Sequence, residues 1–265
     1  DDLGAFHGPL ADGIRRGLRS LRFVAIEPLE HPDIADLIAR ARSLGYGRIE
    51  AWTSARILAD MALASRLRDA GLTAIDVPLL GPDARVHDEV AGVPGSFLET
   101  MSGLRNASGL FQIGWHVVVT RQNAASIEGI VELAGRMGLG LPRFMLLAAP
   151  SSPLPALYRD YAARLTDVAR AVSRLEPSIR GLLMGSHIPP CITERTAGLR
   201  SGATVGAVME GGSFVSDSGP GETGASYKLR SRCHKADRCG AAGRCSGYHA
   251  LYAEIFGSDE FVPLP

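Results

Sequence analysis

The chain has 265 residues, of which 46% are apolar and 21% charged, so it can build a sizeable core and is not a disordered chain. Lysine plus arginine and aspartate plus glutamate number 28 each, so no net positive field favours nucleic acid or a membrane surface as a partner. No apolar run approaches the length that spans a bilayer. The chain starts at Asp1, without an initiator Met or a signal peptide, so we expect it to begin inside a longer protein.

Short apolar runs separated by amphipathic segments fill the first 150 residues. The runs are continuous rather than alternating, which predicts parallel strands covered on both faces. They comprise residues 23–26, 49–52, 74–77, 115–119 and 144–147. Amphipathic helices are predicted at residues 10–18, at 34–44 before Gly45, at 57–67 before Gly71, after a Ser96–Glu99 capping box, after an Asn123 cap, and at 157–172. This alternation predicts an α/β fold with a parallel sheet, open or closed into a barrel.

The alternation of strand and helix patterns does not continue into the last third of the chain, which contains all four cysteines. Cys233, Cys239 and Cys245 are spaced with five residues between neighbours, and 41 residues separate Cys191 from Cys233. Thiols in glycine-rich loops can wrap a soft metal or an iron–sulfur cluster, and neighbouring basic residues, Lys235 and Arg244 among them, would favour thiolates. The spacing alone leaves zinc, a cluster and unrelated thiols open. Two disulfides would need an oxidising compartment, which nothing in the chain indicates.

Two polar residues interrupt the predicted strands. Asp76 lies in an apolar strand, where an ionised carboxylate is costly unless it is paired. It is therefore our candidate for a polar contact to a ligand inside the barrel. His116 also lies in an apolar strand, where we expect a hydrogen-bonded structural histidine rather than a catalytic one.

Several stretches, in order, resemble radical S-adenosylmethionine (SAM) proteins. Residues 23–34 contain Glu27-Pro28 and His31-Pro32, similar to a second strand that ends in Gly-Gly-Glu-Pro before a turn and helix. Residues 46–54, 76–97 and 117–123 resemble the third, fourth and fifth strands with their loops. The tail from Cys245-Ser246-Gly247-Tyr248 to Pro263, with Ile188 to Cys191, resembles members that carry an auxiliary cluster, as in SPASM or twitch extensions.

The resemblance implies a partial (β/α) TIM-like barrel over residues 1–175, without its first strand, and a loop-rich cluster-binding extension over 176–265. It implies an auxiliary [4Fe–4S] cluster on Cys191, Cys233, Cys239 and Cys245. It also implies SAM binding, by residues that match the family's strand ends or face the barrel interior, namely Ala25, Ile26, Glu27, Pro28, Thr53, Ser54, Asp76 and Thr120. In this family an electron from a catalytic cluster cleaves SAM, and the resulting radical takes hydrogen from a peptide or small metabolite.

The chain departs from the family pattern at the catalytic centre. No cysteine precedes Cys191, so the three-cysteine catalytic motif is absent or lies upstream of Asp1. Ala25-Ile26 replaces two glycines that let backbone approach SAM, which favours an impaired site. The prediction is a radical SAM-type protein with an incomplete catalytic site; the alternative is a non-catalytic subunit that keeps one cluster. No catalytic residue is assigned, a protein partner that supplies the missing segment is allowed for, and a reducing cytoplasm is the expected location.

Overall fold

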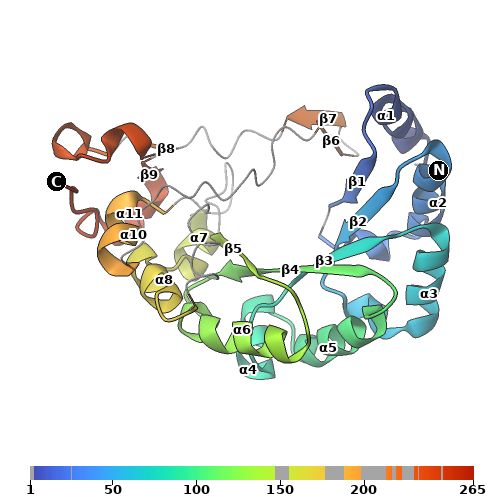
Figure 1. The fold of residues 1–265 in the computed structure, drawn as a ribbon, viewed down its shortest axis with the longest axis horizontal. Helices are drawn as coiled ribbons and strands as arrows, with labels where there is room; N and C mark the ends of the chain where they lie inside the picture. The colour runs from blue at the N-terminus through green and yellow to red at the C-terminus, as the bar shows by residue number, and fades with distance from the viewer. Residues whose placement is uncertain are drawn as a thin grey trace.

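The computed structural model describes most of the chain, with gaps. The described residues are 3–24, 26–146, 155–176, 188–197, 213–216, 219–222, 230–231, 233–245 and 247–265. Among them, five parallel strands form one sheet in chain order, with bounds β1 Ser20–Phe23, β2 Arg48–Trp52, β3 Ala74–Pro78, β4 Gln112–Val119 and β5 Arg143–Leu146. The sheet curls into half of a barrel whose helices cover the outer side (Figure 1). The predicted partial TIM-like α/β fold is confirmed.

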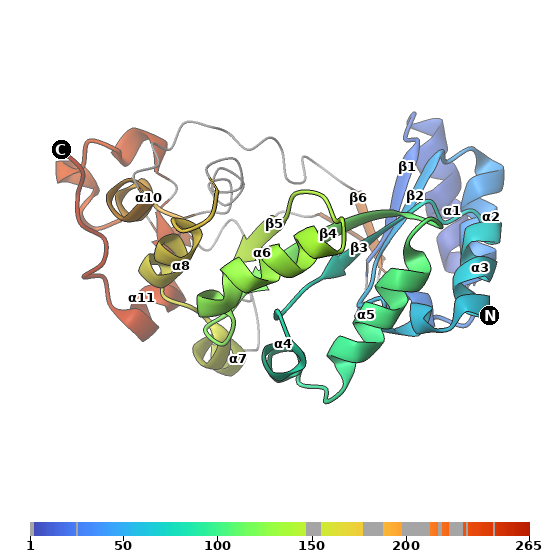
Figure 2. The same cartoon turned by 60° about the horizontal axis from the view of Figure 1, so that its bottom comes forward.

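Helices follow the strands and pack against the convex side, as a second view shows (Figure 2). Their bounds are α1 Leu3–Arg15, α2 Ile34–Leu44, α3 Met61–Ala70, α4 Ala84–Ala91, α5 Ser96–Ala107, α6 Ile127–Arg136, α7 Pro155–Tyr161 and α8 Leu165–Val172. Short 3-10 turns are η1 Pro28–Glu30, η2 Arg56–Ala59 and η3 Ala124–Ser126. No helix of the described ranges combines the length and apolar character that crossing a membrane requires.

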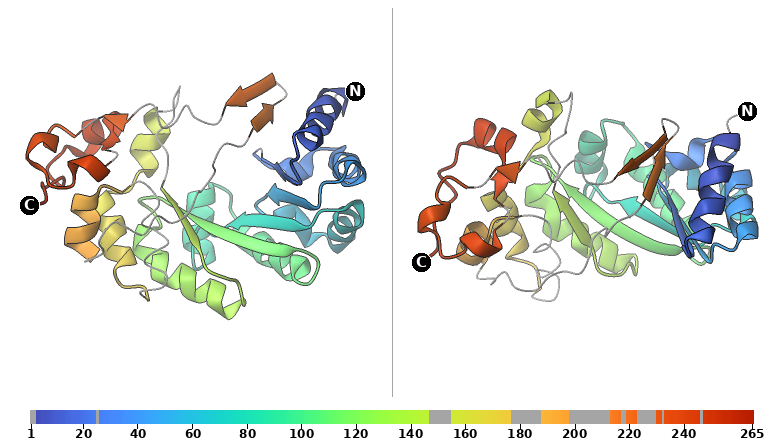
Figure 3. Two further views of the ribbon diagram at one scale, coloured as in Figure 1. Left: turned by 45° about the horizontal axis from the view of Figure 1, so that its top comes forward. Right: turned by 90° about the horizontal axis from the view of Figure 1, so that it is seen from above.

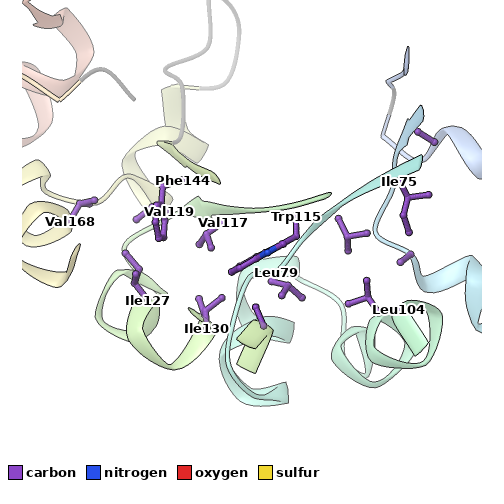
Figure 4. Close-up of a cluster of buried hydrophobic side chains, with 14 of the residues drawn as sticks. Ile75, Leu79, Leu104, Trp115, Val117, Val119, Ile127, Ile130, Phe144 and Val168 are labelled. Carbon is purple, nitrogen blue, oxygen red and sulfur yellow. The ribbon is translucent and has the colours of Figure 1, made fainter. Parts of the chain in front are cut away.

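The core lies between the sheet and these helices. Because successive strand side chains point to opposite faces, Ile75 on β3 and Trp115, Val117 and Val119 on β4 face α5 and α6 (Figure 4). All four are at most 2% exposed. The alternate residues of the same strands, Asp76 and His116 among them, therefore face the inner, concave side of the half-barrel.

Most of the C-terminal extension packs at the end of the half-barrel opposite α1, whereas its two strands at 213–216 and 219–222 lie on the α1 side (Figure 1 and Figure 3). Its described elements are α10 Pro190–Ala197, β6 Ser213–Ser216, β7 Gly219–Glu222, β8 Arg230–Ser231, η5 Ala236–Arg238, η6 Ala242–Arg244, β9 Tyr248–His249 and α11 Ala250–Phe256. The backbone N–H of Leu165 donates to the Tyr252 hydroxyl at 2.8 Å, and that of Thr166 donates to Glu260 at 3.0 Å. These bonds join α8 to the extension. The boundary near residue 175 stays a prediction.

Two predicted elements differ from the structure for tertiary reasons. The first strand is predicted at 23–26 but ends at Phe23, its last partner being Ala51, after which the chain leaves the sheet. The helix predicted over 157–172 is broken between Tyr161 and Leu165. There the Tyr161 carbonyl accepts the N–H of Arg121 at 2.8 Å, so a long-range bond replaces a helical one.

Capping residues were also assigned wrongly. The Ser96 hydroxyl donates to Asp88 at 2.9 Å, and Glu99 pairs with Arg56, so no capping box forms. Asp88 also accepts from the backbone N–H groups of Gly95 and Phe97, and these hydrogen bonds hold its pKa below the ordinary value. The carboxylate of one helix thus closes the start of the next.

A close approach at Gly103 provides a test of the packing of α5. A Cβ atom at this position would overlap the carbonyl oxygen of Ala55, which itself has φ +62°. We expect Gly103→Ala to lower the free energy of unfolding by about 1–3 kcal/mol, measured by urea denaturation. Gly135→Ala is the matched control, because an added Cβ atom there meets no described atom outside its own helix turn within 4 Å. This substitution should raise the free energy of unfolding by about 0.5–1 kcal/mol. Equal stability changes in both variants would contradict the packing argument.

Candidate functional site

The residues predicted to bind SAM mostly follow strand ends at one edge of the half-barrel. Ile26, Glu27 and Pro28 follow β1, Thr53 and Ser54 follow β2, and Thr120 follows β4. Ala25 lies outside the described residues. Since all strands are parallel, their carboxyl ends share this edge, which is where α/β folds place their ligands.

Glu27 connects the first two strand ends. One carboxylate oxygen accepts the backbone N–H of Ser54 at 2.9 Å and its hydroxyl at 2.7 Å. The other accepts the N–H of Leu29 at 3.4 Å, which caps η1. Ile26, which stands where the family pattern has a glycine, is fully exposed. The carboxylate is therefore bound by protein donors on both oxygens.

The two threonines at this edge differ in their hydrogen bonds. The Thr53 hydroxyl accepts the N–H of Ala55 at 3.0 Å. The Thr120 hydroxyl is buried and has no hydrogen-bond partner among the described residues, which makes it the polar atom at this edge that a ligand or water would satisfy. The Thr120 backbone N–H donates to Asn123 at 2.8 Å.

Asn123 does not cap a helix with its side chain, contrary to the prediction. It is fully buried, and its amide donates to the carbonyls of Leu80 and Val118 at 3.0 and 2.9 Å. These carbonyls belong to the loop after β3 and to the end of β4. A buried polar side chain that bonds three backbone groups fixes the relative position of the two strand ends.

Asp76 lies on the inner face rather than with the strand-end residues. One of its oxygens lies 2.5 Å from His116 Nδ1, and the other forms an ion pair with Arg143. Asp76 and His116 are 1% and 4% exposed, and burial lowers the pKa of His116 to about 4. A neutral His116 then donates its Nδ1–H to the carboxylate. His116 is the hydrogen-bonded barrel histidine that the sequence predicts, and Asp76 is paired within the protein.

The sequence analysis missed the other charged residues of this face. Arg22 and Arg48 both pair with Glu50, at 3.1 and 2.9 Å, and the Glu50 side chain is 6% exposed. The available signal was the position of Arg22 and Glu50 within apolar stretches that form strands. With Arg143 and Asp76, these residues place charges on four of the five strands of this sheet.

The four cysteines converge on one pocket in the extension. Cys191, Cys233, Cys239 and Cys245 all line it, and its volume is about 460 Å³ including the part open to solvent. All four are free thiols. The structure thus brings Cys191, on α10, to the three thiols that lie more than 40 residues further along the chain.

Repeated turns present the three closely spaced thiols. The N–H of Ala236 donates to the carbonyl of Cys233 at 2.9 Å, and the N–H of Ala242 donates to that of Cys239 at 3.0 Å. One 3-10 turn therefore lies between each pair of neighbouring thiols: η5 between Cys233 and Cys239, and η6 between Cys239 and Cys245. Arg244, at the end of η6, pairs with Glu194 of α10 at 2.7 Å and so connects the turns to the helix that carries Cys191.

Cys191 is buried and lies far in sequence from the basic residues that flank the other three thiols. Burial and the three other cysteines raise its pKa to about 11. Arg244 is committed to Glu194, while Lys235 lines the pocket and donates to the carbonyl of Ser258 at 3.1 Å. His234, which follows Cys233 in the chain, contacts the Tyr248 hydroxyl through its Nδ1 at 3.0 Å. The backbone N–H of Gly247 donates to Cys245 Sγ at 3.4 Å.

The donor set of the pocket consists of four sulfur ligands. Among the described residues, no group of three or more His, Cys, Asp or Glu side chains is placed to hold one metal ion. The four thiols that line the pocket are soft ligands of the kind that zinc and iron–sulfur clusters both use. An N–H donor to one sulfur is a contact that orients and tunes such a ligand.

Comparison with known proteins gives several similar sequences. The chain is 34% identical over 119 residues to the AdoMet-dependent heme synthase of Nitratidesulfovibrio vulgaris, which is 44% of this chain and 31% of that protein. It is 28% identical over 124 residues to the probable GTP 3′,8-cyclase of Sulfolobus acidocaldarius, 46% of this chain and 39% of that protein. The matched part spans about a third of the length of the heme synthases it resembles. No protein-family model matches the chain.

Solved structures share the fold. Native anSMEcpe with bound AdoMet superimposes with a TM-score of 0.58 over 98% of this chain and 83% of that one, at 12% identity. Native anSMEcpe with AdoMet and the Kp18Cys peptide gives a TM-score of 0.52 over 65% of this chain and 50% of that one, at 13% identity. Together, the names of the similar proteins and the shared fold support the resemblance of this chain to the radical SAM family.

Proposed function

We propose that this chain is the half-barrel and auxiliary cluster-binding part of a radical SAM-type protein that modifies a peptide or small metabolite. An auxiliary [4Fe–4S] cluster would be held by Cys191, Cys233, Cys239 and Cys245, and SAM would bind at the strand-end edge. When bound, such a cluster supplies electron transfer and crosslinks the fold. The catalytic cluster motif is not part of this chain. Other segments or a protein partner would provide it.

One observation carries the proposal: four free thiols from two distant parts of the chain line a single pocket. With all four thiols bound, the cluster has no open iron for substrate. The residues around the pocket then have structural roles. The stacked rings of Tyr248 and Phe261, 4.3 Å apart, form part of the lining of this pocket.

SAM binding is the part of the proposal that rests on the strand-end edge. Glu27 and Ser54, which match the family's glutamate and asparagine positions, are hydrogen-bonded to each other. The Thr120 hydroxyl at the end of β4, which has no hydrogen-bond partner in the described ranges, supports a ligand at the same edge. The Ala25-Ile26 pair, in place of two glycines, supports the alternative of a non-catalytic subunit that keeps one cluster.

Metal analysis of protein purified without oxygen tests the cluster. We expect about four irons and four sulfides per chain, no stoichiometric zinc, and a brown colour. Stoichiometric zinc or a colourless, iron-free protein after reconstitution with iron and sulfide would contradict the proposal. Equilibrium dialysis with labelled SAM then distinguishes the SAM-binding protein from the alternative, a non-catalytic subunit. Saturable binding that Glu27→Gln weakens supports the SAM-binding protein, whereas iron without SAM binding supports the non-catalytic subunit.

A further inference from the structure

Charged side chains gather on the inner, concave face of the half-barrel. We define the inner-face cluster by the side chains that point to the concave side, namely Arg22, Arg48, Glu50, Trp52, Asp76, His116 and Arg143. They come from all five strands. Among the described residues, three guanidinium groups thus face two carboxylates, and the neutral His116 adds no charge.

The carboxylates form the buried floor of this cluster and the guanidinium groups form its solvent side. The side chains of Glu50 and Asp76 are 6% and 1% exposed, whereas those of Arg22, Arg48 and Arg143 are 32%, 48% and 42% exposed. Burial lowers the pKa of Arg143; the nearby Arg22 and Arg48 lower it further, and Glu50 raises it. An arrangement that brings like charges together on its accessible side is complementary to an anion.

Gly114 allows Arg143 to reach Asp76. This glycine lies on the inner face of β4 beside Asp76 and shows no positive φ, so its backbone would accept any residue. A Cβ atom there would lie 3.1 Å from the Asp76 carboxylate and 3.7 Å from Arg143 Nη2. The missing side chain therefore leaves the space through which the Arg143 guanidinium crosses the strand.

Trp52 adds an uncharged donor. Its ring lies between the Arg22 guanidinium, 5.4 Å from its centroid, and the His116 ring at 5.5 Å. Its indole N–H is buried and has no hydrogen-bond partner within the described part of the chain. A buried N–H without a partner is costly, so a ligand or water that accepts from it gains energy.

We propose that the inner-face cluster binds the oxyanion group of a small organic anion, a carboxylate or a phosphate, through Arg143, Arg22 and the Trp52 N–H. Glu50 and Asp76 hold the arginines in place, and His116 positions Asp76. Planar guanidinium groups suit both oxyanions, since they donate two parallel hydrogen bonds. If the proposed function holds, this anion is the class of substrate that the protein modifies. Only the word substrate rests on the proposed function; the binding of the anion does not.

Calorimetric titration of the anaerobically purified protein tests the site with citrate and inorganic pyrophosphate as probes, at constant ionic strength set with NaCl. We expect saturable binding of at least one probe, weakened at least tenfold in Arg143→Gln and unchanged in Arg136→Gln. Arg136 is the matched control, an outer-face arginine of α6 whose side chain is 66% exposed. Preference for citrate assigns a carboxylate ligand, and preference for pyrophosphate assigns a phosphate.

A second variant covers the case in which Arg143→Gln fails to fold. Arg22→Gln leaves Glu50 paired with Arg48 and should also weaken binding. No saturable binding by the wild-type chain, or equal binding by wild type and both inner-face variants, would overturn the inference. The same titration on Cys239→Ser separates it from the cluster proposal. Anion binding that persists in iron-free protein leaves the site standing even where the cluster proposal fails.

Discussion

Cys239→Ser should remove most of the iron and bleach the visible absorbance of the anaerobically purified protein. Cys239 ends η5 and its carbonyl starts the next turn, so it is the central one of the three thiols that the turns present. A serine hydroxyl has nearly the same size but is a poor ligand for iron, because soft thiolates are preferred. Iron and sulfide content per chain and the absorption spectrum measure the effect.

The control for this variant lies one residue away. Arg238→Ser places a serine on the exposed end of η5 and keeps all four thiols. We expect it to retain the iron content of the wild type. Full iron retention by Cys239→Ser would remove this residue from the ligand set, whereas loss of iron in both variants would point to a general disruption of the turn.

Asp76→Ala should lower the free energy of unfolding by about 2–3 kcal/mol, measured by urea denaturation followed by circular dichroism. The substitution leaves the buried Nδ1–H of His116 without its acceptor and Arg143 without its counter-charge. Loss of one partner of a fully buried pair costs about 3–5 kcal/mol, but the Arg143 side chain is 42% exposed and can turn toward water, which reduces the cost.

The matched control is an aspartate whose ion pair is on the surface. Asp167 pairs with Arg170 at 3.0 Å, and the two side chains are 54% and 61% exposed. Asp167→Ala should change the free energy of unfolding by less than about 1 kcal/mol, because solvent screens such a pair. If Asp76→Ala is no more destabilising than this control, the inner-face pair does not hold the sheet together.

Local pattern was enough for the elements whose boundaries depend on nearby residues. The helix predicted over 34–44 is α2, and it ends at Gly45, where φ is +104° and glycine adopts the left-handed conformation without strain. Four of the five strands lie where their apolar runs predict them. The first strand, the helix after residue 157 and the Asn123 cap were wrong, because each is decided by a bond to a residue that is distant in sequence or by the neighbouring strand.

The candidate sites also have some features that nearby residues determine and others that distant contacts determine. Residue type and spacing were sufficient to single out the four cysteines and Asp76, since a carboxylate in an apolar strand or thiols in glycine-rich loops are costly or reactive without a partner. Glu27 and Ser54 were singled out only by the resemblance to radical SAM proteins. The partner that each of these side chains contacts depends on the register of the strands and on how distant segments of the chain pack together. Register alone brings Arg143 past Gly114 to Asp76, and the packing of α10 against the turns brings Cys191 to the other thiols. Such contacts leave no periodic trace in the chain, because they join positions tens of residues apart.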